Sequence, residues 1–270
     1  MRLETIGAGL VHGTALIGRR DTMLLLEHIT GKNSAQVMLG EGDTLPQPDI
    51  FLDYVNRFQA GEPLQYIIGQ WDFMGHPFKV SPHVLIPRPE TELLVELALD
   101  FLATKGAGAK VLDLCTGSGC IAASIARAGQ YHVTAADISP LALDIARENG
   151  EGLAIEFVET DLFTHIKGGF DLIISNPPYI TTEEMGLLSP VVRDFEPHLA
   201  LHGGDDGMDI YRKLVPQSFV HLNPGGGLFL EIGPVGVMDL VKQEGFSHVE
   251  LKADYSGLPR MIIGLKDMEE

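Results

Sequence analysis

The chain is short of cysteine and of positive charge. Its 270 residues include two cysteines, one tryptophan, and 19 Lys+Arg against 37 Asp+Glu, which gives a net charge of −18. Two cysteines, Cys115 and Cys120, are too few for a disulfide framework, so we expect a reducing, cytoplasmic compartment. The shortage of cations argues against nucleic acid as the main partner, because phosphate binding needs clustered Lys and Arg. The acidic excess fits better with a small-molecule cofactor or a basic protein partner.

Long apolar runs are also absent. No stretch approaches the roughly 18 apolar residues of a transmembrane helix, so no membrane association is expected. The first twenty residues lack the apolar centre of a signal peptide. Ten scattered histidines and one Cys-x4-Cys pair do not supply a zinc ligand set, so we expect no metal site. The apolar fraction of 45% excludes a disordered chain.

The apolar pattern divides the chain into three parts. Residues 1–70 carry apolar patches at helical spacing, as in Ile50, Phe51, Tyr54 and Val55, and predict a small helical domain for docking or structure. Residues 71–89 predict a β-hairpin connector that pairs 78–80 with 84–86 around residues 81–83. The remaining part, residues 90–270, begins with a helical pattern.

Strand and helix patterns alternate from Lys110 onward. This alternation predicts βαβ units, a mostly parallel sheet and therefore an α/β domain. The predicted strands are residues 110–114, 132–136, 154–158, 171–175, 226–232, 249–251 and 261–264, and the predicted helices are 118–128, 140–148, 208–222 and 235–244.

A glycine-rich loop follows the first of these strands. The run Cys115-Thr116-Gly117-Ser118-Gly119 lies between a strand and a helix, where glycines let a backbone turn sharply and approach a ligand. The next strand ends in Asp137, whose carboxylate can accept hydrogen bonds from both hydroxyls of an adenosine ribose. These features predict a nucleotide-like cofactor without saying which one.

Two further carboxylates favour S-adenosylmethionine. Asp113 precedes the loop, where a negative charge attracts a cationic cofactor and repels a pyrophosphate. Asp161, followed by Leu162, comes after the third strand, and its carboxylate can accept a hydrogen bond from the adenine amino group.

A second motif, Asn176-Pro177-Pro178-Tyr179, follows the fourth predicted strand. Ligands of open α/β sheets bind at this carboxyl edge. Two prolines remove two backbone donors, so the turn is rich in acceptors for a substrate NH2 group, which an aromatic ring can cover. Such acceptors can orient a poorly nucleophilic amide nitrogen toward a methyl donor and stabilise developing positive charge.

With these residues in hand, the chain resembles the HemK/PrmC family, the glutamine N5-methyltransferases that modify peptide-chain release factors. The motif of residues 176–179 is shared with adenine-N6 methyltransferases, whereas Ile86-Pro87-Arg88-Pro89-Glu90-Thr91-Glu92 and the helical domain are more specific. The resemblance covers almost the whole chain, through residues 24–28, 63–69, 73, 75–80, 85–92, 111–119, 161–163, 175–179, 196–201, 203–208 and 230–233.

The resemblance implies a fold, an activity and a set of site residues. The fold is a Rossmann-like class I methyltransferase sheet of seven strands, the last antiparallel, behind an N-terminal helical domain. The activity is methyl transfer from S-adenosylmethionine, giving S-adenosylhomocysteine, to the glutamine of a Gly-Gly-Gln loop in class-1 release factors. By position, residues 115–119, Asp137, Asp161, Leu162 and Asn176 would bind the cofactor, and residues 176–179 would hold the substrate amide.

Two positions depart from the family pattern, and further functions stay open. Cys115 stands where the loop commonly has glycine, and Leu162 where tryptophan is frequent. The loop sequence also occurs in enzymes that methylate a glutamine of a large-subunit ribosomal protein. Adenine-N6 methylation of nucleic acid and cofactor binding without catalysis are two more functions compatible with the motifs. The net charge opposes adenine methylation, and intact Asn176 and Tyr179 oppose a role without catalysis.

Overall fold

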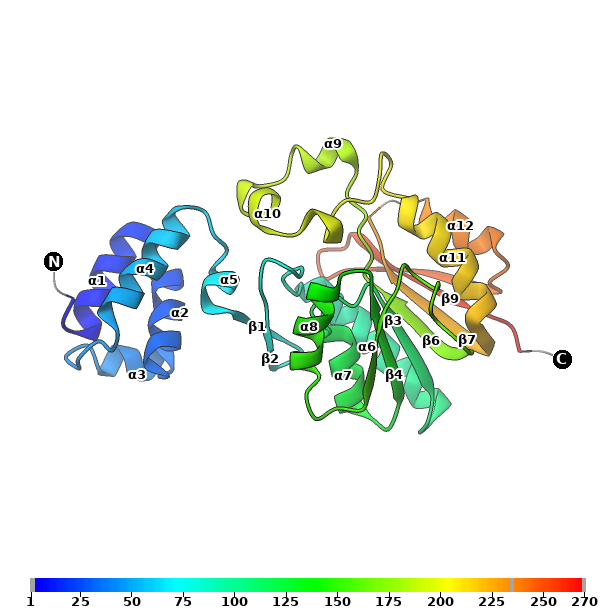
Figure 1. The fold of residues 1–270 in the computed structure, drawn as a ribbon, viewed down its shortest axis with the longest axis horizontal. Helices are drawn as coiled ribbons and strands as arrows, with labels where there is room; N and C mark the ends of the chain where they lie inside the picture. Colours follow the sequence, from blue (N-terminus) through cyan, green and yellow to red (C-terminus); the bar gives the residue numbers. More distant parts are fainter. Residues whose placement is uncertain (1–2, 234–235, 269–270) are drawn as a thin grey trace. The chain divides into compact units, whose positions relative to one another are not determined.

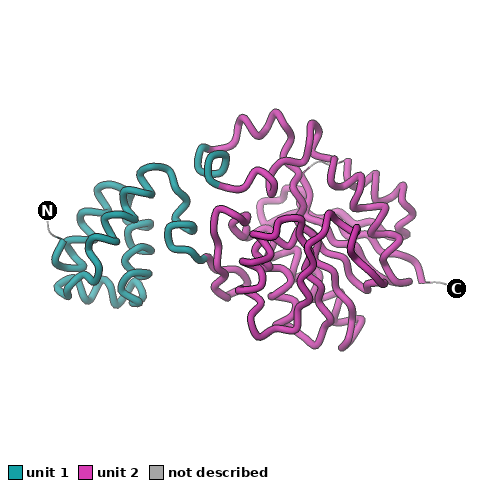
Figure 2. Tube along the Cα trace, in the orientation of Figure 1, with its two compact units in different colours: residues 1–70, 190–195 teal, residues 71–189, 196–270 magenta. Residues whose placement is uncertain are grey.

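The computed structural model describes residues 3–233 and 236–268. It divides into two compact units (Figure 2). The first comprises residues 1–70 together with 190–195, and the second comprises residues 71–189 and 196–270. The hairpin connector expected between two domains thus belongs to the second unit, and the short segment 190–195 is grouped with the first.

The first unit is helical, as its apolar periodicity predicts. Its core contains Leu25 and Leu26 of α2 and Phe51 and Val55 of α4, all fully buried. Gly13 lets α1 approach α2 closely, since a Cβ there would lie 2.6 Å from the Thr22 side chain. The helices are α1 (Ile6–Ile17), α2 (Arg19–Thr30), α3 (Ser34–Leu39), α4 (Pro48–Gln59) and α5 (Leu64–Ile68), with α10 (Pro190–Phe195) from the later segment.

A hairpin is present after α5, but the predicted register is wrong. Strand β1 (Gln70–Phe73) pairs with β2 (His76–Lys79), and residues 84–86 form no strand. The turn is Met74-Gly75, and both residues have positive φ, 51° and 72°. Left-handed angles at two central positions are typical of a tight hairpin turn. Methionine is a rare residue there, so this turn carries no strong sequence signal.

The second unit is built on a seven-stranded sheet in the order β5-β4-β3-β6-β7-β9-β8. Figure 1 labels β3, β4, β6, β7 and β9 of this sheet. The first five strands in this order are parallel, and β9 pairs antiparallel with both β7 and β8. This confirms the predicted α/β class and the antiparallel last strand. The strands are β3 (Lys110–Leu114), β4 (His132–Asp137), β5 (Ile155–Glu159), β6 (Phe170–Ser175), β7 (Leu222–Glu231), β8 (His248–Ala253) and β9 (Pro259–Leu265).

Helices cover both faces of this sheet. Alternate residues of the central strands point to opposite faces, so Val111 and Leu172 pack with α6 and α7, whereas Leu112 and Ile173 pack with α11 and α12. The remaining elements of the unit are α6 (Pro89–Lys105), α7 (Cys120–Ala128), α8 (Pro140–Asn149), α9 (Thr182–Met185), the 3-10 turn η1 (His198–Ala200), α11 (Asp209–His221) and α12 (Val237–Gln243). Val235, which the sequence places in the α12 helix, lies outside the described residues.

The strand order fixes where a ligand binds. After β3 the chain continues to β4 on one side, and β6 then pairs with β3 on the other. Loops leave the carboxyl ends of these strands in opposite directions, and open α/β sheets place their crevice at such a point. No helix of the described residues has both the length and the apolar character needed to span a membrane.

Candidate active site

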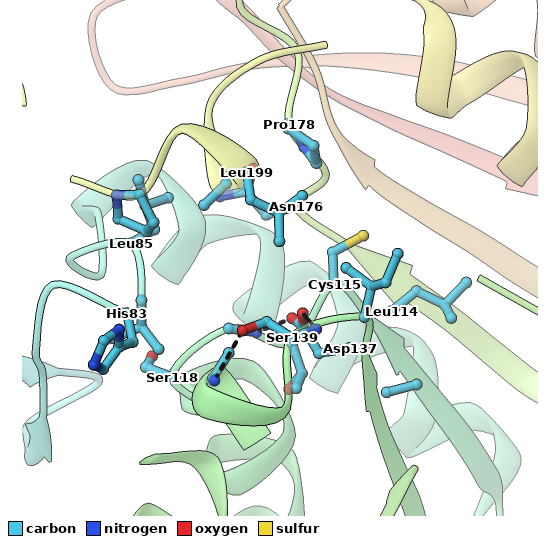
Figure 3. Close-up of a pocket in the computed structure, with 18 of the residues that line it drawn as sticks. His83, Leu85, Leu114, Cys115, Ser118, Asp137, Ser139, Asn176, Pro178 and Leu199 are labelled. Carbon is cyan, nitrogen blue, oxygen red and sulfur yellow. Dashed lines mark hydrogen bonds between the residues drawn. The ribbon is translucent and has the colours of Figure 1, made fainter. Parts of the chain in front are cut away.

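A cavity of about 280 Å³ opens at the carboxyl ends of the central strands. Its walls come from segments that are far apart in sequence, and Figure 3 shows how they converge. The lining includes residues 82–85 and 87–88 before α6, the loop 115–118 after β3, residues 137–139 after β4, residues 160–162 after β5, Asn176 and Pro178 after β6, and Pro197, Leu199, Ala200 and His202 around η1.

The loop after β3 has the backbone that its glycines predict. Gly117 and Gly119 have φ of 54° and 76°, in the left-handed region. Cys115 also has a positive φ, 57°, although it has a side chain. The departure at position 115 therefore keeps the backbone conformation for which glycine is suited.

Asp113 holds this loop from behind. Its Oδ2 atom accepts hydrogen bonds from the Thr116 hydroxyl (2.6 Å) and from the Ala122 backbone N–H (3.1 Å). The carboxyl is fully buried, burial raises its pKa to about 7, and Asp113 is not among the residues that line the cavity. Asp113 therefore has a structural role in holding the loop. Its buried position does not support the expectation that it attracts the cofactor directly.

Asp137, by contrast, lines the cavity. Its Oδ2 atom accepts from the Gly117 N–H and its Oδ1 atom from the Ser139 N–H, both at 2.9 Å. These bonds aim the carboxylate, and each oxygen keeps a second acceptor direction. Burial raises the pKa of Asp137, while the backbone hydrogen bonds oppose the rise. Two oxygens held side by side suit a pair of neighbouring hydroxyl groups.

The next wall supplies an apolar surface with a carboxylate at its end. Leu162 is buried, lines the cavity and has a positive φ of 47°, and Asp161 beside it is exposed. Ile138 and Ala142 line the same cavity. Apolar side chains with one acceptor suit a flat heterocycle that carries an amino group.

The motif after β6 is divided between two cavities. Asn176 and Pro178 line the first cavity, whereas Pro177 and Tyr179 do not, and neither does Gly119 of the loop. The Tyr179 ring packs against Gly233 and lines a second cavity with Arg260. Burial raises the pKa of Tyr179 to about 12, so its hydroxyl stays protonated at neutral pH.

The cavity also has walls to which the sequence pattern assigned no role. Arg88 Nη2 donates to Oε1 of the buried Glu196 (2.5 Å), and Glu196 Oε2 accepts from the Ile86 backbone N–H (3.3 Å). This carboxylate thus joins the segment before α6 to the segment around η1. Both residues lie in stretches that carry the family resemblance, which is the one signal that pointed to them.

The side chains of the cavity suit an organic ligand and do not form a metal-binding group among the described residues. Among residues 3–233 and 236–268, no group of three His, Cys, Asp or Glu side chains could hold a metal ion. Burial raises the pKa of the Cys115 thiol far above neutrality, so this cavity residue remains a thiol and is a poor nucleophile. The arrangement can bind a nucleoside and present an amide acceptor, Asn176, beside it.

Two family models match the chain. The Methyltransferase small domain matches residues 90–254, and the PrmC N-terminal domain matches residues 17–69. The two matches fall on either side of the hairpin.

The solved structures most useful for comparison share the fold. A methyltransferase from Pyrococcus furiosus has a TM-score of 0.52 at 22% identity, over 73% of this chain and 91% of that one. The 16S rRNA N2 G1207 methyltransferase of T. thermophilus, in complex with AdoMet and guanosine, has a TM-score of 0.55 at 20% identity, over 73% and 49%. At these identities the likeness concerns the fold alone.

Sequence relatives are much closer. The release factor glutamine methyltransferase of Koribacter versatilis is 44% identical over 83% of this chain and 84% of its own length. Those of Cereibacter sphaeroides and Clostridium acetobutylicum are 40% and 36% identical over 90% and 91% of this chain, and over 89% and 90% of their own lengths. The chain therefore belongs to the release factor glutamine methyltransferase family.

Proposed function

We propose that this protein transfers a methyl group from S-adenosylmethionine to the side-chain nitrogen N5 of the glutamine in the Gly-Gly-Gln loop of class-1 release factors. The observation that carries the proposal is that Asn176 opens onto the same cavity as Asp137 and the loop of residues 115–118. The carboxylate expected to bind the nucleoside and the carboxamide expected to bind the amide thus share one pocket. The names of the family relatives supply the substrate.

The cavity residues fit this cofactor. Asp137 offers two aimed oxygens for the ribose hydroxyls, and Asp161 with Leu162 offers an acceptor and an apolar surface for adenine. Residues 115–118 would lie along the methionine end. When bound, S-adenosylmethionine supplies an electrophilic methyl group on a positively charged sulfur.

The residues after β6 would hold the substrate amide. Pro177 and Pro178 have no N–H, so this turn offers the substrate NH2 group only acceptors, among them the Asn176 carboxamide oxygen. An acceptor bound to each N–H fixes the rotation of the amide and favours the positive charge that develops on nitrogen as a new N–C bond forms. The bond between the methyl group and sulfur would break as the N–C bond forms, and its electron pair would stay on sulfur to give neutral S-adenosylhomocysteine. The methylated nitrogen would then release one of its protons to solvent and be neutral again.

Two competing substrates would use the same pocket. Glutamine methylation of a large-subunit ribosomal protein involves the same chemistry, but the matched N-terminal domain and the stretch before α6 favour the release factor. Direct contact with nucleic acid is disfavoured by the net charge of −18. We place the protein in the cytoplasm, where its two free cysteines stay reduced.

A methylation assay tests the proposal. The protein is incubated with labelled S-adenosylmethionine and a release factor whose loop glutamine is intact or changed to alanine. Label should enter only the intact factor, and Asn176→Ala should nearly abolish transfer while cofactor affinity stays within a few-fold. Equal labelling of both factors would overturn the proposal, and labelling of a ribosomal protein in place of the release factor would identify that protein as the substrate.

A further inference from the structure

The Asn176 carboxamide is held from behind by a buried hydroxyl and a buried carboxyl group. We propose that Thr91 and Glu231 are positioning residues that fix this carboxamide with its oxygen toward the substrate amide. The inference rests on the proposed function, because it concerns the group that would hold the substrate. Neither residue belongs to the cofactor motifs: Thr91 comes from the first turn of α6, and Glu231 ends β7.

The contacts form a chain of three groups. The Asn176 Nδ2 group donates to Thr91 Oγ1 at 3.1 Å, and Thr91 Oγ1 donates to Glu231 Oε2 at 2.6 Å. The exposed fraction is 3% for both Thr91 and Glu231. Water therefore does not compete for the bond between Thr91 and Glu231. The chain bridges positions that are 85 and 140 residues apart in sequence.

Proton counting gives this chain a direction. A threonine hydroxyl has one hydrogen, and here it is donated to Glu231 Oε2. The side of Thr91 Oγ1 that faces Asn176 is then a lone pair, so only the NH2 end of the carboxamide can meet it. A flipped Asn176 would place its oxygen against another oxygen with no hydrogen between them. By accepting this hydrogen, Glu231 selects one of two amide orientations of nearly equal shape.

The orientation matters for the reaction. With Nδ2 turned to Thr91, the Asn176 Oδ1 atom is the part of the carboxamide that can accept a hydrogen bond from a ligand in the cavity. In the flipped state, two NH2 groups would face each other, and the substrate amide would lose its acceptor. Thr91 also lines the cavity, but both Thr91 and Glu231 are proposed to act by orienting Asn176.

Glu231 is itself held in place. Its backbone carbonyl accepts a hydrogen bond from the buried Tyr211 hydroxyl at 2.8 Å. Burial raises the pKa of Glu231 to about 7 and Glu90 adds to the rise, whereas the Thr91 hydrogen bond and the two arginines nearby oppose it. Burying a carboxyl group costs free energy unless the group is paired or hydrogen-bonded. A buried Glu231 at the end of β7 therefore favours a functional role for this residue.

Thr91→Val is the direct test, since valine keeps the shape and removes the hydroxyl. We expect kcat for release-factor methylation to fall at least 10-fold, with KM for S-adenosylmethionine within twofold. Thr91→Ser should recover most of the rate, and Thr104→Val, an exposed change on the same helix, should leave it unchanged. An unchanged kcat for Thr91→Val, or equal losses for valine and serine, would overturn the proposal.

Glu231→Leu tests the other half. Without the carboxylate, the Thr91 hydrogen can turn toward Asn176 and both amide orientations become accessible, so kcat should fall several-fold. The double variant Thr91→Val, Glu231→Leu should be no slower than Thr91→Val alone, because both changes act on one group. Losses that multiply would show that the two residues act separately and would overturn the proposal.

A spectroscopic measurement separates this inference from the proposed function. In protein labelled with 15N at asparagine, the Asn176 side-chain NH2 signals, identified by their loss in Asn176→Ala, should shift in Thr91→Val and return toward wild type in Thr91→Ser. Unshifted signals in Thr91→Val would contradict the inference even if methylation is confirmed. If wild type fails to methylate the release factor, the proposed function fails while the contact is still tested.

Discussion

Glu196 holds Arg88 with one carboxylate oxygen and the Ile86 backbone N–H with the other. Only 1% of the Glu196 side chain is exposed, against 33% for Arg88. A buried carboxylate whose two oxygens are both bonded leaves little freedom to either segment that it joins. The segment before α6 and the segment around η1 therefore form one continuous wall of the cavity.

Glu196→Gln should loosen this wall. Replacing the charge weakens the bond to Arg88, so the free energy of unfolding should fall by about 1–3 kcal/mol, as for a lost hydrogen bond to a charged group. KM for S-adenosylmethionine should also rise, because the loosened wall lines the cofactor cavity. Denaturant titration and initial rates measure the two effects. Glu183→Gln, at an exposed position, is the matched control, and equal behaviour of the two variants would contradict the interpretation.

Asp137→Ala should weaken cofactor binding by on the order of 1–3 kcal/mol, roughly 5- to 150-fold, because the ribose loses its charged acceptor. The Gly117 N–H also loses its partner, so the loop should become less ordered. Calorimetry with S-adenosylhomocysteine measures the affinity. Asp144→Ala serves as control, since that carboxylate is exposed on α8 and pairs with Arg147. An affinity like that of wild type would place the ribose contact elsewhere.

Position 115 should tolerate glycine and reject a β-branched residue. At a φ of 57° a side chain is strained, and β-branched side chains are the most strained. The free energy of unfolding of Cys115→Gly should lie within about 1 kcal/mol of the wild-type value. That of Cys115→Val should be lower by about 2 kcal/mol or more. Cys115→Ala separates the loss of the thiol from the backbone effect. Thermal unfolding of the three variants checks the order, which a stable Cys115→Val would contradict.

The raised pKa of Glu231 predicts how the stability of the protein depends on pH. Burial is the main cause that raises this pKa from 4.5 to about 7. The folded protein then binds more protons than the unfolded chain between these values, so the contribution of Glu231 to stability is complete below pH 4.5 and is lost as pH rises through 7. Glu231→Gln, which stays neutral, should therefore gain stability relative to wild type between about pH 5 and pH 8.

The size of that gain is bounded by the shift in pKa. A change from 4.5 to about 7 corresponds to up to ~3 kcal/mol. Denaturant titrations of both proteins across this range measure it. Glu156→Gln, an exposed carboxylate on β5, should show no such trend. A constant difference between Glu231→Gln and wild type across the range would mean that Glu231 is already ionised at its acidic end.

Local patterns predicted most of the second unit. The predicted strand at residues 110–114 has the same bounds in the structure. The helices α7, α8, α11 and α12 begin and end within a few residues of their predicted bounds. These elements are specified by their own periodicity, and α7, α8 and α12 also have a glycine at one or both ends. Asp137 and Asn176 reach one cavity because parallel strands end at the same edge of a sheet, which the sequence also predicts.

Contacts that the periodicity does not encode were missed. Glu196 and Arg88 are 108 residues apart in sequence, and Thr91 and Glu231 are 140 residues apart. A local sequence pattern therefore cannot predict either contact. The hairpin register depends on left-handed angles at Met74, a residue that is not a turn signal. Asp113 stands beside the cofactor loop in sequence, but its side chain points to the helix start behind the loop.

Asn149, the last residue of α8, sets a limit on how the chain can be cut. Its Nδ2 group donates to the carbonyl oxygens of Lys79 and Ser118, at 3.0 Å and 2.8 Å, and its Oδ1 atom accepts from the Lys79 N–H at 2.7 Å. One nearly buried carboxamide thus binds both the hairpin and the cofactor loop.

An expression fragment that starts at residue 90 would remove Lys79 and leave this carboxamide with unsatisfied donor and acceptor positions beside the loop. The hairpin therefore belongs to any minimal catalytic fragment, whose first residue must precede β1.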